Sequence, residues 1–165
     1  MRNRRTFTEN LIYVGSEEDM KAVVTRVTEA SVTIDGKIHG AIGQGFLVLL
    51  GIAPEDTEET AVYLADRICG VRVFEDNNGK MNLNLGKVGG ELLVVSQFTL
   101  FADLKSRRPG FSGAAKPEVA IPLYEKFMAE CKARGFHVEH GEFGADMKVA
   151  SLNDGPVTLV FDTEI

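Results

Sequence analysis

The chain has 165 residues, a formal net charge of -6 from 18 basic and 24 acidic side chains, and 44% hydrophobic residues. This length and composition are typical of a single globular domain. No apolar run approaches the ~20 residues of a membrane-spanning helix, and the 2 cysteines are too few for a disulfide framework or a four-thiolate zinc site. Taken alone, the acidic balance argues against a protein that coats nucleic acid through its overall charge.

Residues 1–19 differ from the rest of the chain, because they show no clear helical or strand periodicity. Their apolar run, Leu11–Val14, is shorter than the apolar core of a secretory signal, which has roughly 7–15 residues. Their acidic residues also argue against a transit peptide, because transit peptides contain few acidic residues. We interpret Met20 as the true or ancestral start, and residues 1–19 as an upstream extension or cloning remnant that is expected to be disordered. The alternative is an ordered extra element. With no signal and no membrane span, we expect a cytoplasmic protein.

The beginning of the remaining domain, residues 20–165, is typical of a run of strands. Lys21–Val27 and Ala30–Ile34 are rich in Val, Thr and Ile, which favours strands. Asp35-Gly36 indicates a hairpin turn before a return strand over Ile38–Ile42. The continuous apolar run Gly45–Gly51 predicts a strand that is buried on both faces.

A helix is expected after this strand. Asp56 is the predicted N-cap, with Glu59 completing a capping box, and Gly70 lies where the helix should end. Apolar residues at helical spacing give its buried face: Ala61, Leu64, Ala65 and Ile68. A short strand, Val71–Phe74, should follow.

The second half of the chain repeats the order of strand and helix. Glu91–Phe101 is the strongest predicted strand, and Leu104–Lys116 is a predicted loop. Pro117 suits the first turn of a second helix, and Gly135 suits its end. Three further strands are expected at His137–His140, Lys148–Leu152 and Val157–Phe161. This order predicts a single α+β domain with mainly antiparallel or mixed sheets packed with two helices.

Several common catalytic and cofactor sites are not indicated. None of the three histidines has the spacing of a metal-binding motif, and both cysteines lie on apolar helix faces, as buried small hydrophobic residues do. The glycine-rich segment 40–45 lacks the Lys-Ser/Thr ending of a phosphate loop, so it predicts a hairpin bend. We therefore expect no cofactor and no metal. A histidine- or metal-dependent esterase would be inhibited by chelators or by substitution of His137, and we expect neither.

Two segments depart from the pattern of their surroundings. In Ser96–Leu100, polar residues interrupt an apolar run, which by itself predicts a strand with one solvent face. In Asn153–Thr158, an Asn-x-Gly-Pro sequence lies between two predicted strands and would ordinarily form a hairpin turn. A Gly-Pro peptide bond can be cis at a cost of only about 0.5–1 kcal/mol. We predict a cis bond at Gly155–Pro156, which would give two carbonyl groups fixed and unusual directions.

Together, Ser-Gln-Phe-Thr-Leu at 96–100 and Asn-x-Gly-Pro-x-Thr at 153–158 resemble the paired signatures of D-aminoacyl-tRNA deacylases. The resemblance extends over Met20–Phe161, and it includes Arg-Arg-Pro-Gly-Phe-Ser at 107–112 and Ala-Asp-Met at 145–147. It implies a deacylase-type fold with a barrel-like sheet. It also implies cleavage of the ester between a D-amino acid and the terminal ribose of tRNA. Residues 1–19 have no counterpart in it.

The resemblance further implies a homodimer with its active site at the subunit boundary. The catalytic segment that one subunit would offer is Ser96, Gln97, Phe98 and Thr99. The partner would insert Gly155 and Pro156, whose carbonyl groups bind the α-amino group of the substrate and leave no room for an L side chain. Because glycine has no side chain, glycyl-tRNA mischarged on tRNA(Ala) should also be hydrolysed.

The remaining residues of the implied site bind the substrate. Arg26 would brace the Gly-Pro turn, Asn153 belongs to the same signature, and Phe111 and Ser112 would lie near the terminal adenosine. Thr99 could act as a nucleophile only beside a general base, which the sequence lacks, so a positioning role is favoured. Backbone N–H groups of the same segment would form an oxyanion hole, and the substrate's ribose 2′-hydroxyl would help to activate water.

A further contact with the tRNA, beyond its 3′ end, is one of two alternatives for a basic segment of the chain. A loop with four cations, Lys105, Arg107, Arg108 and Lys116, could contact phosphates or could be merely solvated. The alternative function is a non-catalytic nucleic-acid-binding module of the same fold. Replacement of Gly155 or Pro156 would leave binding by such a module intact, whereas it would impair a deacylase.

Overall fold

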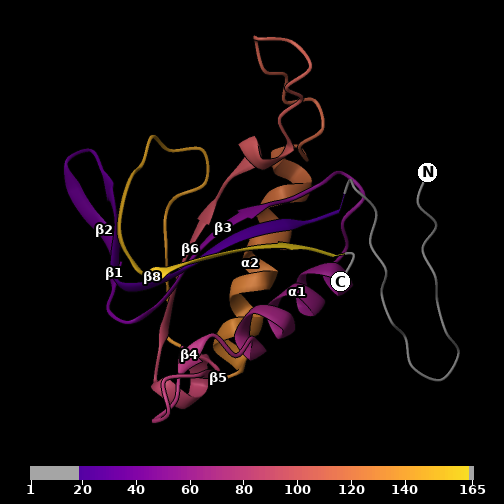
Figure 1. Ribbon diagram of the computed structural model, residues 1–165. Coiled ribbons are helices and arrows are strands. Elements are labelled where there is room, and N and C mark those ends of the chain that lie inside the picture. The colour runs from indigo at the N-terminus through magenta and orange to yellow at the C-terminus, as the bar shows by residue number, and fades with distance from the viewer. Residues whose placement is uncertain (1–18, 164–165) are drawn as a thin grey trace, which may run out of the picture.

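The computed structural model describes residues 19–163, so the predicted N-terminal extension lies almost wholly outside the described residues. Figure 1 shows α1 and α2 packed together against a curved main sheet. The elements are β1 (Lys21–Ile34), β2 (Lys37–Ile42), β3 (Gly45–Gly51), α1 (Glu58–Gly70), β4 (Phe74–Glu75), β5 (Met81–Leu83), η1 (Leu85–Val88), β6 (Glu91–Ser96), η2 (Phe98–Phe101), α2 (Pro117–Ala133), β7 (Val138–His140) and β8 (Lys148–Asp162).

The long strand β1 organises the main sheet. Its first half, Lys21–Val27, pairs antiparallel with β3 and β8, and its second half, Ala30–Ile34, pairs antiparallel with β2 and β8. β6 pairs parallel with β3, and β7 pairs parallel with β6. The ends of the sheet approach each other, since a Cβ on Gly40 of β2 would lie 3.0 Å from the His140 carbonyl oxygen of β7. The predicted α+β fold with a mixed, barrel-like sheet is confirmed.

The central strands are buried on both faces. Leu92 and Val94 of β6 pack into the larger core with helix residues such as Phe127, whereas Leu93 and Val95 pack into a smaller cluster on the other face. This division follows from the two-residue period of a strand. It explains why β3 and β6 are nearly continuous apolar runs in the sequence.

The start of α1 differs from the prediction by one residue. Thr57 is the N-cap, and its capping-box partner is Thr60 instead of the predicted glutamate. Asp56 is buried, and its carboxylate accepts backbone N–H groups from Met20 at 2.9 Å and Ala53 at 2.7 Å. The physical reason is that the buried carboxylate is stabilised by two charge-assisted hydrogen bonds, one from nearby Ala53 and one from Met20, 36 residues earlier, so Asp56 does not serve as the helix cap.

The two cysteines meet between the helices. Cys69 of α1 and Cys131 of α2 are both buried free thiols, with their Sγ atoms 3.8 Å apart. They therefore fill the helix contact as small hydrophobic residues, as predicted. No helix between residues 19 and 163 has the length and apolar character needed to span a membrane.

Candidate active site

The Ser96–Thr99 segment does not continue as a strand. β6 ends at Ser96, and the chain enters the 3-10 helix η2 with Gln97 as its N-cap. The Gln97 N–H donates to the Leu50 carbonyl at 2.8 Å, and the Leu100 N–H donates to the Gln97 carbonyl at 3.2 Å. The predicted strand through Phe101 is therefore wrong beyond Ser96.

Gly51 provides the space for this turn. A Cβ at Gly51 would lie 2.9 Å from the Phe101 ring and 3.0 Å from the Gln97 carbonyl oxygen. β3 ends at Gly51, one residue after Leu50 pairs with Ser96, so β6 loses its neighbour at this level. The backbone after Ser96 then folds over the end of β3 instead of extending the sheet.

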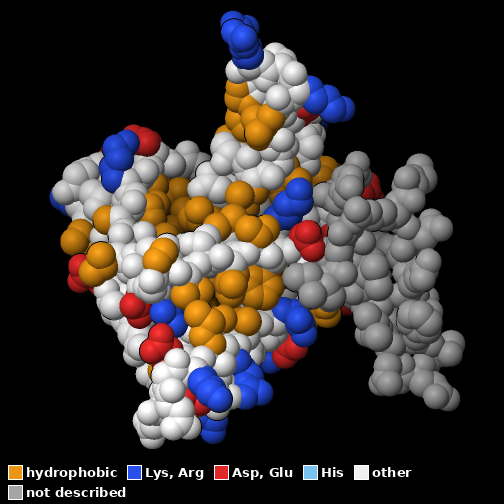
Figure 2. All heavy atoms as spheres, viewed as in Figure 1, with side chains coloured by type: hydrophobic (Ala, Val, Ile, Leu, Met, Phe, Trp, Pro, Cys, Tyr) orange, Lys and Arg blue, Asp and Glu red, His pale blue; other side chains and the backbone are white. Residues whose placement is uncertain are grey.

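The turn brings an unusual set of groups to the surface. Phe98 is 55% exposed, and its ring packs edge-on against the ring of Phe111, with centroids 5.1 Å apart. The Gln97 side-chain amide donates to the Thr99 hydroxyl. Since the Leu100 N–H makes the first hydrogen bond of η2, the N–H groups of Phe98 and Thr99 lie at its open N-terminal end. Figure 2 shows hydrophobic side chains gathered at the base of the segment that protrudes beside this turn.

Between Asn153 and Thr158, β8 leaves its pairing with β1 in an excursion (residues 154–157), instead of forming the predicted hairpin turn. The pairing register with β1 passes from Thr25–Thr158 to Val27–Asn153, so a single β1 residue lies opposite four residues of β8. Both sides of the excursion pair antiparallel with the same strand, which makes residues 148–162 one strand with a wide bulge. The Gly155–Pro156 peptide bond at its tip is cis, as predicted, and Gly155 has a φ of +126°.

Arg26 is the β1 residue opposite this excursion. Its side chain is buried, its Nε donates to the Asp154 carbonyl at 2.9 Å, and its Nη1 donates to the Val73 carbonyl. The Asp154 carboxylate lies 3.7 Å from Nε and offsets the positive charge. A Cβ at Gly155 would lie 2.7 Å from Nη2. One guanidinium therefore joins β1, the base of the excursion and the segment before β4, and it fits closely against Gly155.

Asn153 closes the base of the excursion from the other side. Its Oδ1 accepts the Val157 N–H at 2.9 Å, and its Nδ2 donates to the Thr158 hydroxyl at 3.0 Å. Gly155 and Pro156 are exposed at the tip. The excursion thus combines a hydrogen-bonded base with an exposed backbone tip.

The two signature segments lie far apart along the sheet of one chain. β3 and β1 separate β6 from β8, which amounts to three strand spacings or roughly 14 Å. Ser96 pairs with Leu50, and Leu50 pairs with Ala22, whereas the excursion faces Arg26. This adds an offset of about 13 Å along the strands at 3.3 Å per residue. The strand pairing of a single chain does not bring the Ser96–Thr99 turn next to Gly155.

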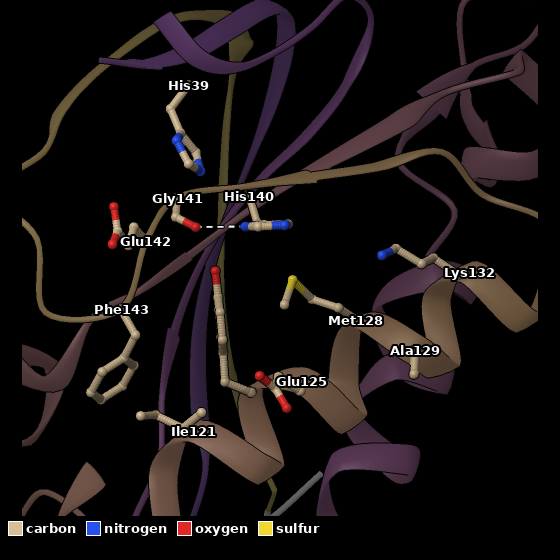
Figure 3. Close-up of a pocket in the computed structure, with 11 residues that line it drawn as sticks. His39, Ile121, Glu125, Met128, Ala129, Lys132, His140, Gly141, Glu142 and Phe143 are labelled. Carbon is tan, nitrogen blue, oxygen red and sulfur yellow. Dashed lines mark hydrogen bonds between the residues drawn. The ribbon is translucent and has the colours of Figure 1, made fainter. Parts of the chain in front are cut away.

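A cavity of about 430 Å³ opens between α2 and the residues after β7 (Figure 3). The Tyr124 hydroxyl in its wall donates to the Val94 carbonyl at 2.8 Å, and the Gly141 N–H donates to the same oxygen at 3.2 Å. Burial raises the pKa of Tyr124. Nothing in the sequence pattern indicated that the Tyr124 hydroxyl bonds to β6, two residues before Ser96.

The side chains around this cavity include two imidazoles. His39 and His140 pack edge-on with ring centroids 5.8 Å apart, and His140 Nδ1 lies 2.6 Å from the Gly141 carbonyl oxygen. Within residues 19–163, no group of three or more His, Cys, Asp or Glu side chains is arranged to hold a metal ion.

Comparison with known proteins agrees with this architecture. The family model for D-Tyr-tRNA(Tyr) deacylase matches residues 23–162. A D-aminoacyl-tRNA deacylase of Thermus aquaticus is 58% identical over 145 residues, which cover 87% of this chain and 95% of the relative. One of Desulfatibacillum aliphaticivorans is 56% identical over 146 residues, covering 88% of this chain and all of the relative.

Solved structures agree as well. The chain is similar to a c-Myc DNA Unwinding Element Binding Protein, with 43% identity and a TM-score of 0.81 over 86% of this chain and 97% of that one. It shares its fold with a probable eukaryotic D-amino acid tRNA deacylase at 16% identity, with a TM-score of 0.75 over 86% of this chain and 98% of that one. With both signatures present and most of its length matched, the chain belongs to the D-Tyr-tRNA(Tyr) deacylase family.

Proposed function

We propose that this protein hydrolyses the ester that joins a D-amino acid to the 3′-terminal ribose of tRNA, and so releases the free D-amino acid and the tRNA. Family membership and the names of its relatives support this activity. The single observation that carries it is the exposed Gly155–Pro156 tip, whose base is held by the buried Arg26 guanidinium. Such a tip presents backbone atoms to a ligand at fixed positions.

The tip would read the handedness of the substrate through backbone atoms. Its carbonyl oxygens would accept hydrogen bonds from the α-ammonium group, which are stronger than those between neutral groups. With the ammonium and the ester held, an L side chain would point into the tip, whereas a D side chain would point away from it. No side-chain pocket is needed, so many D-amino acids should be accepted. Glycine, including glycine mischarged on tRNA(Ala), should be hydrolysed too.

The Ser96–Thr99 turn would supply the chemistry. An aminoacyl ester is already activated, and the N–H groups at the open end of η2 would stabilise the oxyanion that forms when water attacks. The Thr99 hydroxyl accepts a hydrogen bond from the Gln97 amide, which is not a base. We therefore assign Thr99 a positioning role, and the substrate's 2′-hydroxyl would help to activate the water. Ser96 and Gln97 would shape the floor of the pocket.

Phe111 and Ser112 would contact the terminal adenosine. Phe111 is exposed and lies against Phe98, so one face of this aromatic pair is available to a base. Bases of single-stranded RNA ends are commonly recognised by stacking on aromatic side chains. This would place the ester, one ribose away, beside the Thr99 turn.

A homodimer would bring the two signatures together. Because two strands separate them in one chain, the Gly155–Pro156 tip would enter the site of a second copy, and two-fold symmetry would create two equivalent sites. Leu152 and Val160, on either side of the excursion, are 57% and 68% exposed. Figure 2 shows further hydrophobic side chains over this face. Exposed apolar surface around the tip supports a protein interface there.

A non-catalytic nucleic-acid-binding module is the second candidate function. The similarity to a protein named for binding a DNA unwinding element favours it. Such a module has no use for a clamped backbone tip, which in the proposed deacylase would hold the amino-acid ester. Substitution of Pro156 by alanine would leave nucleic-acid binding intact in a module, whereas it would impair hydrolysis or selectivity in a deacylase.

The deciding experiment compares two substrates that differ only in handedness. Purified protein is incubated with D-tyrosyl-tRNA and, separately, with L-tyrosyl-tRNA, and the remaining ester is followed over time. We expect release of D-tyrosine and an L-ester that decays at the rate of the buffer control. Loss of both esters at similar rates would contradict backbone discrimination, and loss of neither would contradict the deacylase assignment.

A further inference from the structure

A loop that we call the arm, Asp103–Gly110, projects from the body of the protein after η2 (Figure 1). The Asp103 N–H donates to the Gly110 carbonyl at 2.7 Å, and the Gly110 N–H donates to the Asp103 carbonyl at 3.0 Å. Inside the arm, the Asp103 carboxylate accepts the Lys105 N–H at 3.0 Å, and the Ser106 hydroxyl accepts the Arg108 N–H at 3.1 Å. These bonds close the arm into a defined loop.

The arm concentrates positive charge in an acidic protein. Lys105, Arg107 and Arg108 are all exposed, and Figure 2 shows Lys and Arg side chains at its end. Its one carboxylate, on Asp103, is bonded to backbone at the base. The whole chain carries -6, so the arm is a local positive region on a protein of net negative charge.

The position of the arm relates it to the turn after β6. It begins two residues after η2 ends and stops one residue before Phe111, which packs against Phe98. Arg107 lies four residues after Asp103 and three before Gly110, so the tip can reach up to ~10 Å from the base. This reach is comparable with the length of three nucleotides in a stacked strand, at about 3.4 Å of axial rise for each phosphate.

We propose that the arm binds the phosphates of the RNA strand that leads away from the terminal adenosine, and so holds the body of the tRNA. This inference rests on the proposed function. Arginine suits the task, because its planar fork matches the oxygens of a phosphate. Phosphate contacts carry no sequence information. The arm would therefore serve tRNAs of many amino acids. Recognition through backbone atoms would likewise accept many D-amino acids.

The test uses the variant Lys105→Ala/Arg107→Ala/Arg108→Ala and two esters. With D-tyrosyl-tRNA, we expect KM to rise about tenfold or more, and the slope of log(kcat/KM) against log[salt] to become shallower by about 2–3, since each lost phosphate contact removes 0.7–0.9. With D-tyrosyl-adenosine, which has the same ester but no phosphates, we expect unchanged kinetics. Binding of uncharged tRNA should weaken in parallel.

The matched control is Lys37→Ala/Lys80→Ala/Lys87→Ala, which removes three exposed cations from the β1–β2 turn and the β4–η1 region. It should keep the salt slope of the unaltered protein. Equal losses on both esters, an unchanged slope, or an equal effect of the control would each overturn the proposal. If the unaltered protein hydrolyses neither ester, the proposed function fails, and the binding of uncharged tRNA still decides the role of the arm.

Discussion

Replacing Gly155 by alanine is expected to lower kcat/KM for D-tyrosyl-tRNA by about 100-fold or more, which corresponds to about 2.7 kcal/mol. The added Cβ would lie 2.7 Å from Arg26 Nη2, and the φ of +126° is one that L side chains rarely adopt. Either Arg26 leaves the Asp154 carbonyl or the tip moves, and both shift the backbone atoms that are proposed to hold the α-ammonium group. Initial rates at several substrate concentrations measure the effect.

Gly144→Ala is the matched control for this substitution. Gly144 also has a positive φ, of +80°, but a Cβ there meets nothing within 4 Å. The control therefore also places an L side chain at a positive φ, at a cost of order 1–3 kcal/mol, in the connection between β7 and β8 and outside both signature segments. Its kcat/KM should stay near that of the unaltered protein. A Gly155→Ala variant that keeps full kcat/KM and full discrimination against L-tyrosyl-tRNA would contradict the role of the tip.

Arg26→Lys is expected to lower both the free energy of unfolding, by about 1–3 kcal/mol, and kcat/KM for D-tyrosyl-tRNA, by about tenfold or more. Lysine keeps the charge but has a single nitrogen, which cannot donate to the Asp154 and Val73 carbonyls at the same time. One buried carbonyl loses its partner, and the base of the excursion loses its clamp. Urea unfolding and steady-state kinetics on the folded protein separate the two effects.

Arg134→Lys serves as the control for this change. Arg134 pairs with Asp66 on the helix surface at 3.1 Å, far along the chain from either signature. A surface ion pair of this kind contributes only about 0–1 kcal/mol, so stability and kcat/KM should barely change. If Arg26→Lys were less stable but kept full kcat/KM in its folded fraction, Arg26 would support the fold without positioning the tip.

Local patterns predicted most of the fold. The apolar run of β3 predicted a strand that is buried on both faces, and the run of β6 predicted a strand. Helical spacing and Gly70 predicted α1, and Pro117 and Gly135 predicted the ends of α2. Asp56 was mistaken for a helix cap because one of its two donors, the Met20 N–H, lies 36 residues earlier in the chain. Periodic patterns over a short stretch of sequence do not show a contact between residues so far apart in the chain.

Long-range contacts that local sequence patterns do not show also shape the two signature segments of the site. Phe98–Phe101 has the composition of a strand, and it turns into η2 because β3 ends at Gly51 and leaves space for the Phe101 ring. Asn-x-Gly-Pro has the composition of a hairpin turn. It forms an excursion because Arg26, 128 residues earlier, holds the Asp154 carbonyl while β8 continues along β1. In both segments a long-range contact overrides the local preference.

Overall charge was an incomplete guide to the partner. The net charge of -6 describes the whole surface, whereas binding of an RNA end depends on the few cations near it. The sequence located the cluster at Lys105, Arg107 and Arg108, but only the hydrogen-bonded base of the arm shows that they project together beside Phe111.

The cross-chain site is tested most directly by combining two inactive chains. Gly155→Ala alters the tip and is paired with Thr99→Trp, which places a bulky ring at the exposed turn that is proposed to face the substrate. The two chains are co-expressed with different affinity tags, and the heterodimer that carries both tags is purified. In a two-fold dimer with shared sites, one site receives both altered segments and the other receives neither.

We predict that this heterodimer regains about half of the unaltered D-tyrosyl-tRNA deacylase activity per dimer, while each parent homodimer stays inactive. The L-ester should remain intact throughout. A heterodimer as inactive as its parents would mean that each site is built from one chain, and it would contradict the account.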